Sequence, residues 1–293
     1  MSLTAFVRLQ EVTARLKPFR PPPPRKIDAP LKVAPKTKNW SLVGTAFDYF
    51  LRFEIKRRAP HAKDGMWTAE ATHILVSNLH LSPLLKEQVA FCGWKDYELV
   101  DFCDRILHEA KAAYSAFAKT PSPSSSQLAI LAGHAIRLAR LDAIYRARRI
   151  DETLRNDPDP ADVEDLLALL DLVPFENLLH DANLLLNPTF GDSSRLVAGA
   201  DVDLISGDRL IDFKTTKEEQ MKVTLLDEIF GWYLLARNQR RLDGKFPEIN
   251  KLGFYFCRHG HLWLKDASEW TSKPGFAELE KWFCEHAREV YSH

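Results

Sequence analysis

The sequence predicts a mixed α/β fold, in which helices precede a mixed, mostly antiparallel sheet that is itself flanked by helices. Apolar residues recur at three- and four-residue spacing through much of the first 170 residues, which is typical of helices. Between residues 184 and 216 the pattern changes to short β-rich runs separated by turn residues. A helical pattern at 225–241, a strand pair at 251–265 and a helical pattern at 276–291 complete the order.

The chain is expected to divide into three regions. Residues 1–38 form a short amphipathic helix and a basic, proline-rich arm, residues 39–165 form a helical region, and residues 166–293 form the mixed core. Its proline content predicts that the arm is extended in a polyproline-type conformation. The RPPPPR segment could dock on an aromatic groove of a protein partner, although a tether is the commoner role.

The helical region contains one element with an unusual face. Helices are expected around residues 40–58, 69–77, 82–90, 95–118 and 128–149. In the last of these, His134 and Asp142 share a broad face with leucines that should point into a core. Each polar group is either satisfied inside the core or part of a functional cleft, and the pattern leaves both interpretations open.

Charge and hydropathy exclude some classes of protein. Forty basic and forty acidic residues cancel, so net charge does not indicate a nucleic-acid-binding protein. Basic residues nevertheless gather at 17–38 and at 136–149, where they are either contacts for a phosphate backbone or a solvated surface. No apolar run approaches the roughly 18 residues that a membrane span needs, and the N-terminus lacks signal-peptide features. A cytoplasmic protein without membrane association is therefore expected.

The four cysteines do not form a metal-binding pattern. They are widely spaced and include no pair separated by two residues, whereas zinc and iron–sulfur sites usually show such pairs. We therefore expect reduced thiols and no iron–sulfur cluster.

The run GADVDLISGDRLIDFKTTK, residues 199–217, is the most informative stretch. A two-residue turn at Gly207-Asp208 would place Asp203 opposite Asp212 and Asp201 opposite Lys214. Strand alternation then puts these four charged residues on one face of the hairpin.

Two carboxylates directly opposed across a strand pair repel each other, so they need a counter-charge. A hard divalent cation such as Mg²⁺ or Mn²⁺, held by Asp203 and Asp212, would supply it. Lys214 could then orient or activate a water, or stabilise charge on a phosphate. The alternative is a polar surface hairpin with an ordinary Asp201–Lys214 ion pair.

The pattern of an aspartate strand followed by Asp-Phe-Lys-Thr resembles the PD-(D/E)XK nuclease superfamily, and in particular its RecB-type exonuclease branch. The resemblance implies a restriction-endonuclease-like core of helix, three strands, helix and strand. It implies that Asp203 and Asp212 are the metal-binding acids, that the main-chain carbonyl of Phe213 is a further ligand, and that Lys214 is the catalytic lysine.

Two further family features fit less closely. The branch carries a Gln-hydrophobic-x-x-Tyr motif on the next helix, and the matching positions here are Glu228 and Trp232. Glu228 would contact a metal-bound water or DNA, or else be a solvated acid. For the helical acid that the superfamily often supplies, Asp142, Glu176 and Glu54 compete, with Asp142 preferred.

The resemblance implies a Mg²⁺- or Mn²⁺-dependent nuclease that hydrolyses phosphodiester bonds in DNA, with RNA left open. The alternative function is a nuclease-derived fold that binds nucleic acid or a protein partner without cleaving. A third hypothesis is a helical scaffold recruited through the proline-rich arm.

Overall fold

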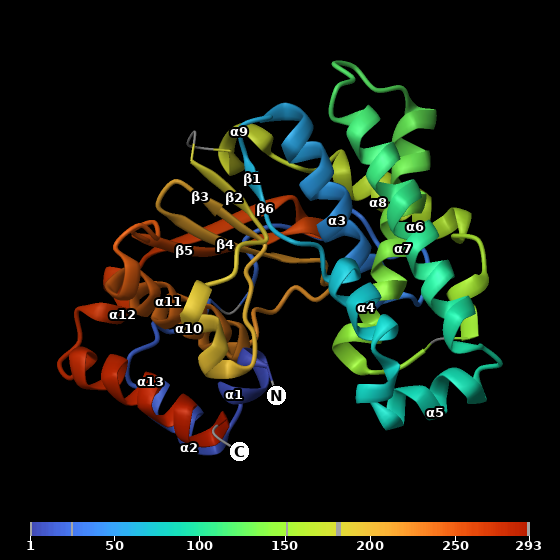
Figure 1. Ribbon diagram of the computed structural model, residues 1–293. Helices are drawn as coiled ribbons and strands as arrows, with labels where there is room; N and C mark the ends of the chain where they lie inside the picture. Colours follow the sequence, from blue (N-terminus) through green and yellow to red (C-terminus); the bar gives the residue numbers. More distant parts are fainter. Residues whose placement is uncertain (1, 25, 151, 180–182, 292–293) are drawn as a thin grey trace. The chain divides into compact units, whose positions relative to one another are not determined.

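The computed structural model describes residues 2–24, 26–150, 152–179 and 183–291 (Figure 1). The chain forms two compact units. Unit 1 comprises Met1–Lys32, Ala62–Gly65 and Pro174–His293, and unit 2 comprises Val33–His61 and Met66–Val173. These boundaries differ from the three expected regions, because the N-terminal 32 residues and a short central segment join the C-terminal region.

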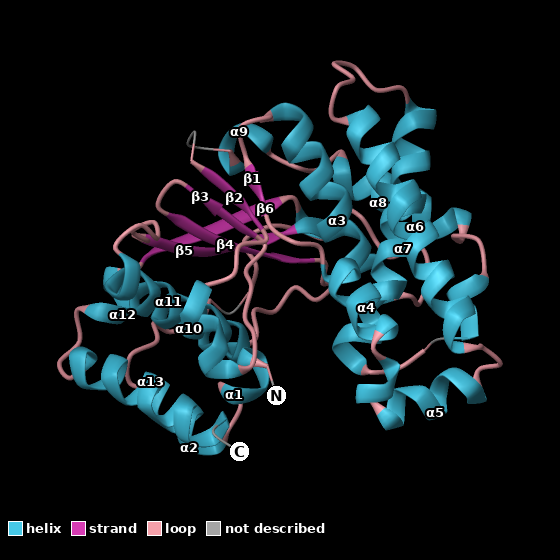
Figure 2. Ribbon diagram, viewed as in Figure 1, coloured by secondary structure: helices cyan, strands magenta, loops and turns pink. Residues whose placement is uncertain are grey.

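Unit 1 contains a six-stranded mixed sheet, coloured magenta in Figure 2. The spatial order of the strands follows the chain. β1 and β2 are parallel, as are β4 and β5, and the other neighbouring pairs are antiparallel. The strands are β1 (Lys63–Asp64), β2 (Leu184–Leu186), β3 (Leu204–Ser206), β4 (Arg209–Lys214), β5 (Lys251–Phe256) and β6 (His261–Asp266).

The described segments of unit 1 confirm the mixed α/β class and the order of three strands, helix and hairpin. Helix α11 (Val223–Asp243) joins β4 to the parallel strand β5. Its apolar residues pack on the strand residues that face it, such as Leu210, Leu252 and Phe254, and all three are fully buried. Strand β1 was not predicted, because two polar residues carry no alternation and its partner β2 lies far away in the sequence.

The N-terminal helix is part of the core of unit 1. It consists of α1 (Leu3–Phe6) and α2 (Gln10–Leu16), separated by a turn. Phe6, Val12 and Leu16 are fully buried in the same apolar cluster as α11. Burying a side chain of this size stabilises a fold by about 1.5–3 kcal/mol, so this segment contributes substantially to the stability of unit 1.

The proline-rich arm is attached to unit 1 through residue 32. The amide of Ile27 donates to the carbonyl of Glu219 over 2.7 Å, and the amide of Lys32 donates to the carbonyl of Arg258 over 2.9 Å. Arg20 forms a 2.7 Å ion pair with Asp227 in which both side chains are largely buried. The first half of the arm is therefore anchored rather than a free tether.

The remaining helices of unit 1 include a C-terminal helix that has the bounds that the sequence predicts. They are α9 (Phe175–Leu178), α10 (Gly191–Ser194), α12 (Ser268–Thr271) and α13 (Phe276–Tyr291), with 3₁₀ turns at Arg195–Val197 and Cys257–His259.

Unit 2 is helical, and its long helices confirm the expected elements. Asp159 caps α8 and Ser124 caps α7, each accepting a hydrogen bond from the first turn of its helix. The helices are α3 (Trp40–Arg58), α4 (Thr68–Ser77), α5 (Pro83–Phe91), α6 (Asp96–Phe117), α7 (Ser125–Ala147) and α8 (Pro160–Leu170), with 3₁₀ turns at Leu79–Leu81 and Glu152–Arg155. Across the described parts of both units, no helix has the length and apolarity to cross a membrane.

One glycine permits the close pairing of β5 and β6. A Cβ atom at Gly253 would lie 2.1 Å from the carbonyl oxygen of Trp263 and 2.6 Å from a methyl of Leu264. We expect Gly253→Ala to destabilise unit 1 by about 2 kcal/mol, because backbone must move to relieve the overlap. Hydrogen–deuterium exchange of the β5 and β6 amides would measure the effect.

Gly133→Ala, in helix α7, is the matched control. Its added Cβ would meet nothing closer than a Pro158 carbon at 3.8 Å, and alanine favours a helix over glycine by about 1 kcal/mol. This variant should therefore be neutral or stabilising. Unchanged exchange in Gly253→Ala would contradict the close packing of β5 on β6.

Candidate functional site

The β3–β4 hairpin has the predicted register. Gly207, the first residue of the two-residue turn, has a φ of 62°, a conformation that glycine adopts readily. Ser206 pairs with Arg209 and Leu204 pairs with Ile211. Asp203 immediately precedes β3, and continuing the register places it opposite Asp212 of β4.

The carboxylate of Asp203 bonds to the backbone of the neighbouring strand. Its Oδ2 atom accepts a 2.5 Å hydrogen bond from the amide of Phe213. Because β3 begins at Leu204, this bond continues the contact between the two strands past the last ladder pair. Asp203 is therefore fixed beside the segment that carries Asp212 and Lys214.

Three further charged groups converge at this end of β4. The Nζ atom of Lys214 lies 2.7 Å from Oδ2 of Asp212 and 3.7 Å from Oε2 of Glu228 on α11. Asp212 and Glu228 are almost fully buried, while the Lys214 side chain is 24% exposed. The ammonium also lies 5.7 Å from the centre of the Trp232 ring. Two strands and one helix thus contribute to one charged cluster.

The carboxylates hold Lys214 in its charged form. Burial acts to lower the pKa of Lys214, but the negative charges of Asp212 and Glu228, the hydrogen bond to Asp212 and the charge of Asp203 outweigh it and raise this pKa above its usual value. Nearby, burial and the charges of Asp203 and Asp212 raise the pKa of the Cys257 thiol. Both effects show that negative charge is concentrated here.

Arg8 completes the cluster from the N-terminal segment. Its Nη2 atom lies 2.8 Å from Oε1 of Glu228, and its side chain is 59% exposed. Sequence reasoning did not identify Arg8, because more than 200 residues separate it from Glu228 and no local pattern connects them. The same holds for the neighbouring pair Arg20 and Asp227.

The alternative interpretation of the sequence is a polar surface hairpin in which Asp201 pairs with Lys214. Asp201 forms an isolated antiparallel bridge with Thr189, next to the end of β2. Lys214 pairs with Asp212 and Glu228. The hairpin is thus not a polar surface with a simple cross-strand pair, because its Asp212 is buried against α11.

Asp142 belongs to unit 2. It is buried, accepts a 2.6 Å hydrogen bond from the hydroxyl of Tyr49, and lies 3.7 Å from Nε of Arg146. Burial raises the pKa of Asp142 to about 7, against the opposing effects of the Tyr49 hydrogen bond and of nearby arginines.

Glu54 and Glu176 are the other two candidates for the helical acid, and each has different surroundings. Glu54 is in unit 2, where it forms ion pairs with Arg57 and Arg58 at 2.6 and 2.7 Å. Glu176 is an exposed residue of α9. Within the part of the chain that the structure describes, no group of three or more His, Cys, Asp or Glu side chains is arranged to hold a metal ion. The third acid that the resemblance implies is therefore not identified.

Comparisons of this chain with protein-family models, with curated proteins and with solved structures found no match. A function can therefore be inferred only from the residues and their geometry.

The four cysteines are free thiols, and they are divided between the units. Cys92 and Cys103 belong to unit 2, and Cys257 and Cys284 belong to unit 1.

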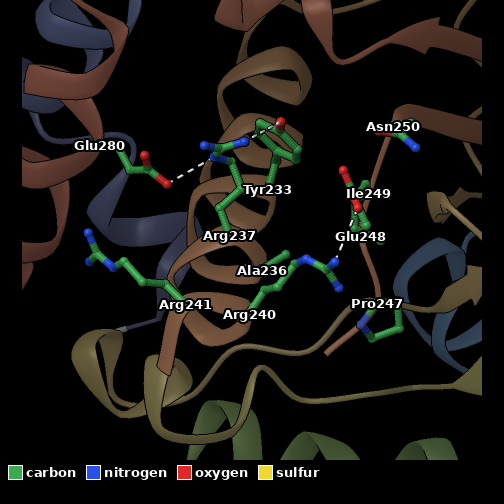
Figure 3. Close-up of a pocket in the computed structure, with 10 residues that line it drawn as sticks. All are labelled: Tyr233, Ala236, Arg237, Arg240, Arg241, Pro247, Glu248, Ile249, Asn250 and Glu280. Atoms are coloured by element: carbon green, nitrogen blue, oxygen red, sulfur yellow. Dashed lines mark hydrogen bonds and ion pairs between the residues drawn. The ribbon is translucent and has the colours of Figure 1, made fainter. Parts of the chain in front are cut away.

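A separate cavity of about 370 Å³ lies in unit 1 beside the later turns of α11, and Figure 3 shows its walls. Arg237 pairs with Glu280 at 2.9 Å, and Arg240 pairs with Glu248 at 3.1 Å. These glutamates neutralise two of the arginines in the cavity. It contains none of the residues that the sequence predicts as catalytic, and its paired charges make it a weaker candidate for an anionic substrate.

Proposed function

We propose that unit 1 is a divalent-metal-dependent nuclease of the PD-(D/E)XK type that hydrolyses phosphodiester bonds in DNA. The observation that carries the proposal is the convergence of Asp212, Lys214 and Glu228 beside Asp203, where two adjacent strands meet the helix that follows them. The order of β2, β3, β4, α11 and β5 supports a restriction-endonuclease-like core.

The donor set suits a hard cation. Asp203 and Asp212 supply carboxylate oxygens, and the carbonyl of Phe213 lies between Asp212 and Lys214 in the sequence of β4, so these three groups would hold Mg²⁺ or Mn²⁺. Three carboxylates, including Glu228, face one lysine and the exposed Arg8, so a cation would also reduce the repulsion among them. Such an ion supplies charge neutralisation at the phosphate and an activated water.

Three side chains of the cluster would each have a separate role in the reaction. Lys214, held charged and 24% exposed, would donate hydrogen bonds to a non-bridging phosphate oxygen and stabilise the charge that develops there. Glu228 would fix the lysine from α11 and accept a hydrogen bond from the attacking water. Arg8, at the exposed edge of the cluster, would bind a neighbouring phosphate.

Asp212→Asn tests this proposal directly. The substitution keeps the shape of the side chain but removes a negative charge and a metal ligand, so we expect the cleavage rate to fall by about 10²- to 10³-fold. The measurement is cleavage of linear duplex, single-stranded and circular DNA, with RNA as a further substrate, in Mg²⁺ or Mn²⁺.

Asp208→Asn is the matched control, because Asp208 occupies the turn of the same hairpin outside the charged cluster. Its cleavage rate should stay within twofold of the unsubstituted protein. Isothermal titration with Mn²⁺ separates loss of metal from loss of folding. If every substrate remains intact with either metal, the nuclease proposal is wrong.

One observation favours a second function for unit 1, namely binding of nucleic acid or a protein partner without cleavage. Lys214 and Asp212 already neutralise each other at 2.7 Å, so this pair does not require a bound cation to balance its charge. A protein of this kind would bind DNA equally well with and without metal, and Asp212→Asn would leave its affinity unchanged.

A further inference from the structure

Unit 2 contains a cavity of about 950 Å³ that the proposed active site does not use. Its walls come from the start of α3 and the two residues before it, the last turns of α7, and residues 149, 153 and 156–160. This volume is near the upper end of the roughly 300–1,000 Å³ of typical ligand sites. The cavity therefore has room for more than one planar group.

An aromatic side chain lines this cavity at its α3 wall. Trp40, the first residue of α3, is 53% exposed, although an indole of this size is usually well covered. Aromatic faces of this kind stack with nucleic-acid bases, and each stacked base stabilises a complex substantially. The position of Trp40 thus suits a planar ligand.

Four cationic side chains line the same cavity. The guanidinium of Arg140 is fixed by a 2.5 Å hydrogen bond to the carbonyl of Asn156. The side chains of Lys38 and Arg149 line the cavity and are exposed. Arg146 is the fourth. Phosphate groups are the natural partners of such an arrangement.

The acids of the cavity do little to offset this positive charge. Asp157 forms a 3.0 Å ion pair with Arg137, and Asp159 accepts a hydrogen bond from the backbone at the start of α8. Asp142 lies 3.7 Å from Nε of Arg146, so it offsets at most that one arginine, and burial raises the pKa of this carboxyl to about 7. The charge that remains to be neutralised by a ligand is positive.

We propose that this cavity binds single-stranded nucleic acid, with an unpaired base stacked on Trp40 and backbone phosphates at Lys38 and Arg149. Bases in a duplex are already stacked and cannot reach an aromatic group inside a cavity, whereas a single strand can. The relevance of this binding to cleavage rests on the proposed nuclease function, but the binding itself needs no residue of the β3–β4 hairpin.

Fluorescence anisotropy of the full chain with a labelled oligothymidylate of about 12 nucleotides, in EDTA, tests the proposal. Trp40→Ala should weaken binding about tenfold without changing its dependence on salt, because stacking releases no counterions. Lys38→Ala and Arg149→Ala should each weaken binding and reduce the slope of log K against log salt by about 0.7.

The controls lie on unit 2 outside the cavity. Tyr97 and Lys86 are exposed there, and Tyr97→Ala and Lys86→Ala should bind as the unsubstituted chain does. Trp40→Phe should retain most of the affinity, since it retains a stacking face. Equal affinity of Trp40→Ala and the unsubstituted chain, equal losses in the controls, or binding of a free nucleotide but not of the oligonucleotide would each overturn the proposal.

The test distinguishes this inference from the nuclease proposal. Asp212→Asn should bind the oligonucleotide as tightly as the unsubstituted chain. Binding without cleavage would count against the active site only, and cleavage without the expected Trp40 and Lys38 effects would count against the unit 2 cavity only.

Discussion

Lys214→Met is expected to destabilise unit 1 by about 3 kcal/mol at pH 7 and to abolish the proposed nuclease activity. Removing one partner of a buried ion pair leaves the other charge without compensation, and this costs more than the pair itself contributes. Asp212 would lose a partner at 2.7 Å, while Glu228 would keep Arg8 at 2.8 Å. Hydrogen–deuterium exchange of the β4 and α11 amides measures the loss of stability.

A double-mutant cycle isolates the electrostatic cause. Adding Asp212→Asn to Lys214→Met removes the uncompensated carboxylate, so the double variant should recover most of the lost stability but no activity. Lys251→Met, on the neighbouring strand β5, is the control and should change stability by no more than about 0.5 kcal/mol. If the double variant is no more stable than Lys214→Met, the uncompensated carboxylate of Asp212 is not the cause of the lost stability.

Asp142 is expected to make unit 2 less stable as the pH rises. Its folded-state pKa of about 7 lies above the ordinary aspartate value of 3.8, so the folded state binds the proton more tightly than the unfolded state. The stability that this proton provides is fully present below about pH 4 and is lost as the pH rises toward 7. At about 1.4 kcal/mol per pKa unit, the loss reaches about 4 kcal/mol.

Asp142→Asn should remove this pH dependence, because asparagine does not titrate. The difference in unfolding free energy between pH 5 and pH 8 should shrink by roughly 3 kcal/mol relative to the unsubstituted chain. Carboxyl ¹³C chemical shifts give the midpoint independently. Tyr49→Phe removes a hydrogen bond that favours the charged form, so the pKa of Asp142 should rise further in that variant.

Three charged groups around Asp142 also affect its pKa. Arg146 and Arg52 lower its pKa and Asp48 raises it, and their effects are smaller than that of burial. A carboxyl midpoint below pH 5 would show that the arginines outweigh burial, and would contradict the expected pH profile.

Local patterns predicted most of the secondary structure. The long helices of unit 2, helix α11 and the C-terminal helix have strong helical spacing or clear capping residues. The two-residue turn at Gly207-Asp208 sets the register of β3 and β4. Counting residues outward from this turn therefore predicts that Asp203 lies opposite Asp212. These features depend on residues close together in the chain, where spacing carries the information.

Features that join distant segments were not predictable. The two-residue strand β1, the anchoring of the arm at Ile27 and the contact of Arg8 with Glu228 each link residues far apart in the sequence. The pattern marked Asp142 as unusual, but could not show that its hydrogen-bond partner is Tyr49 in unit 2. No spacing rule reports such contacts, because they arise only when the chain has packed.

By itself, the sequence determined which charged residues of unit 1 lie together, since strand alternation and a two-residue turn bring Asp203, Asp212 and Lys214 to one face of the hairpin. The tertiary structure alone decided how their charges are balanced. It buries Asp212 against α11, brings Glu228 to 3.7 Å from Lys214 and adds Arg8 from the other end of the chain. The physical reason is that charge balance depends on burial and distance in space, and a sequence gives neither until the core has formed.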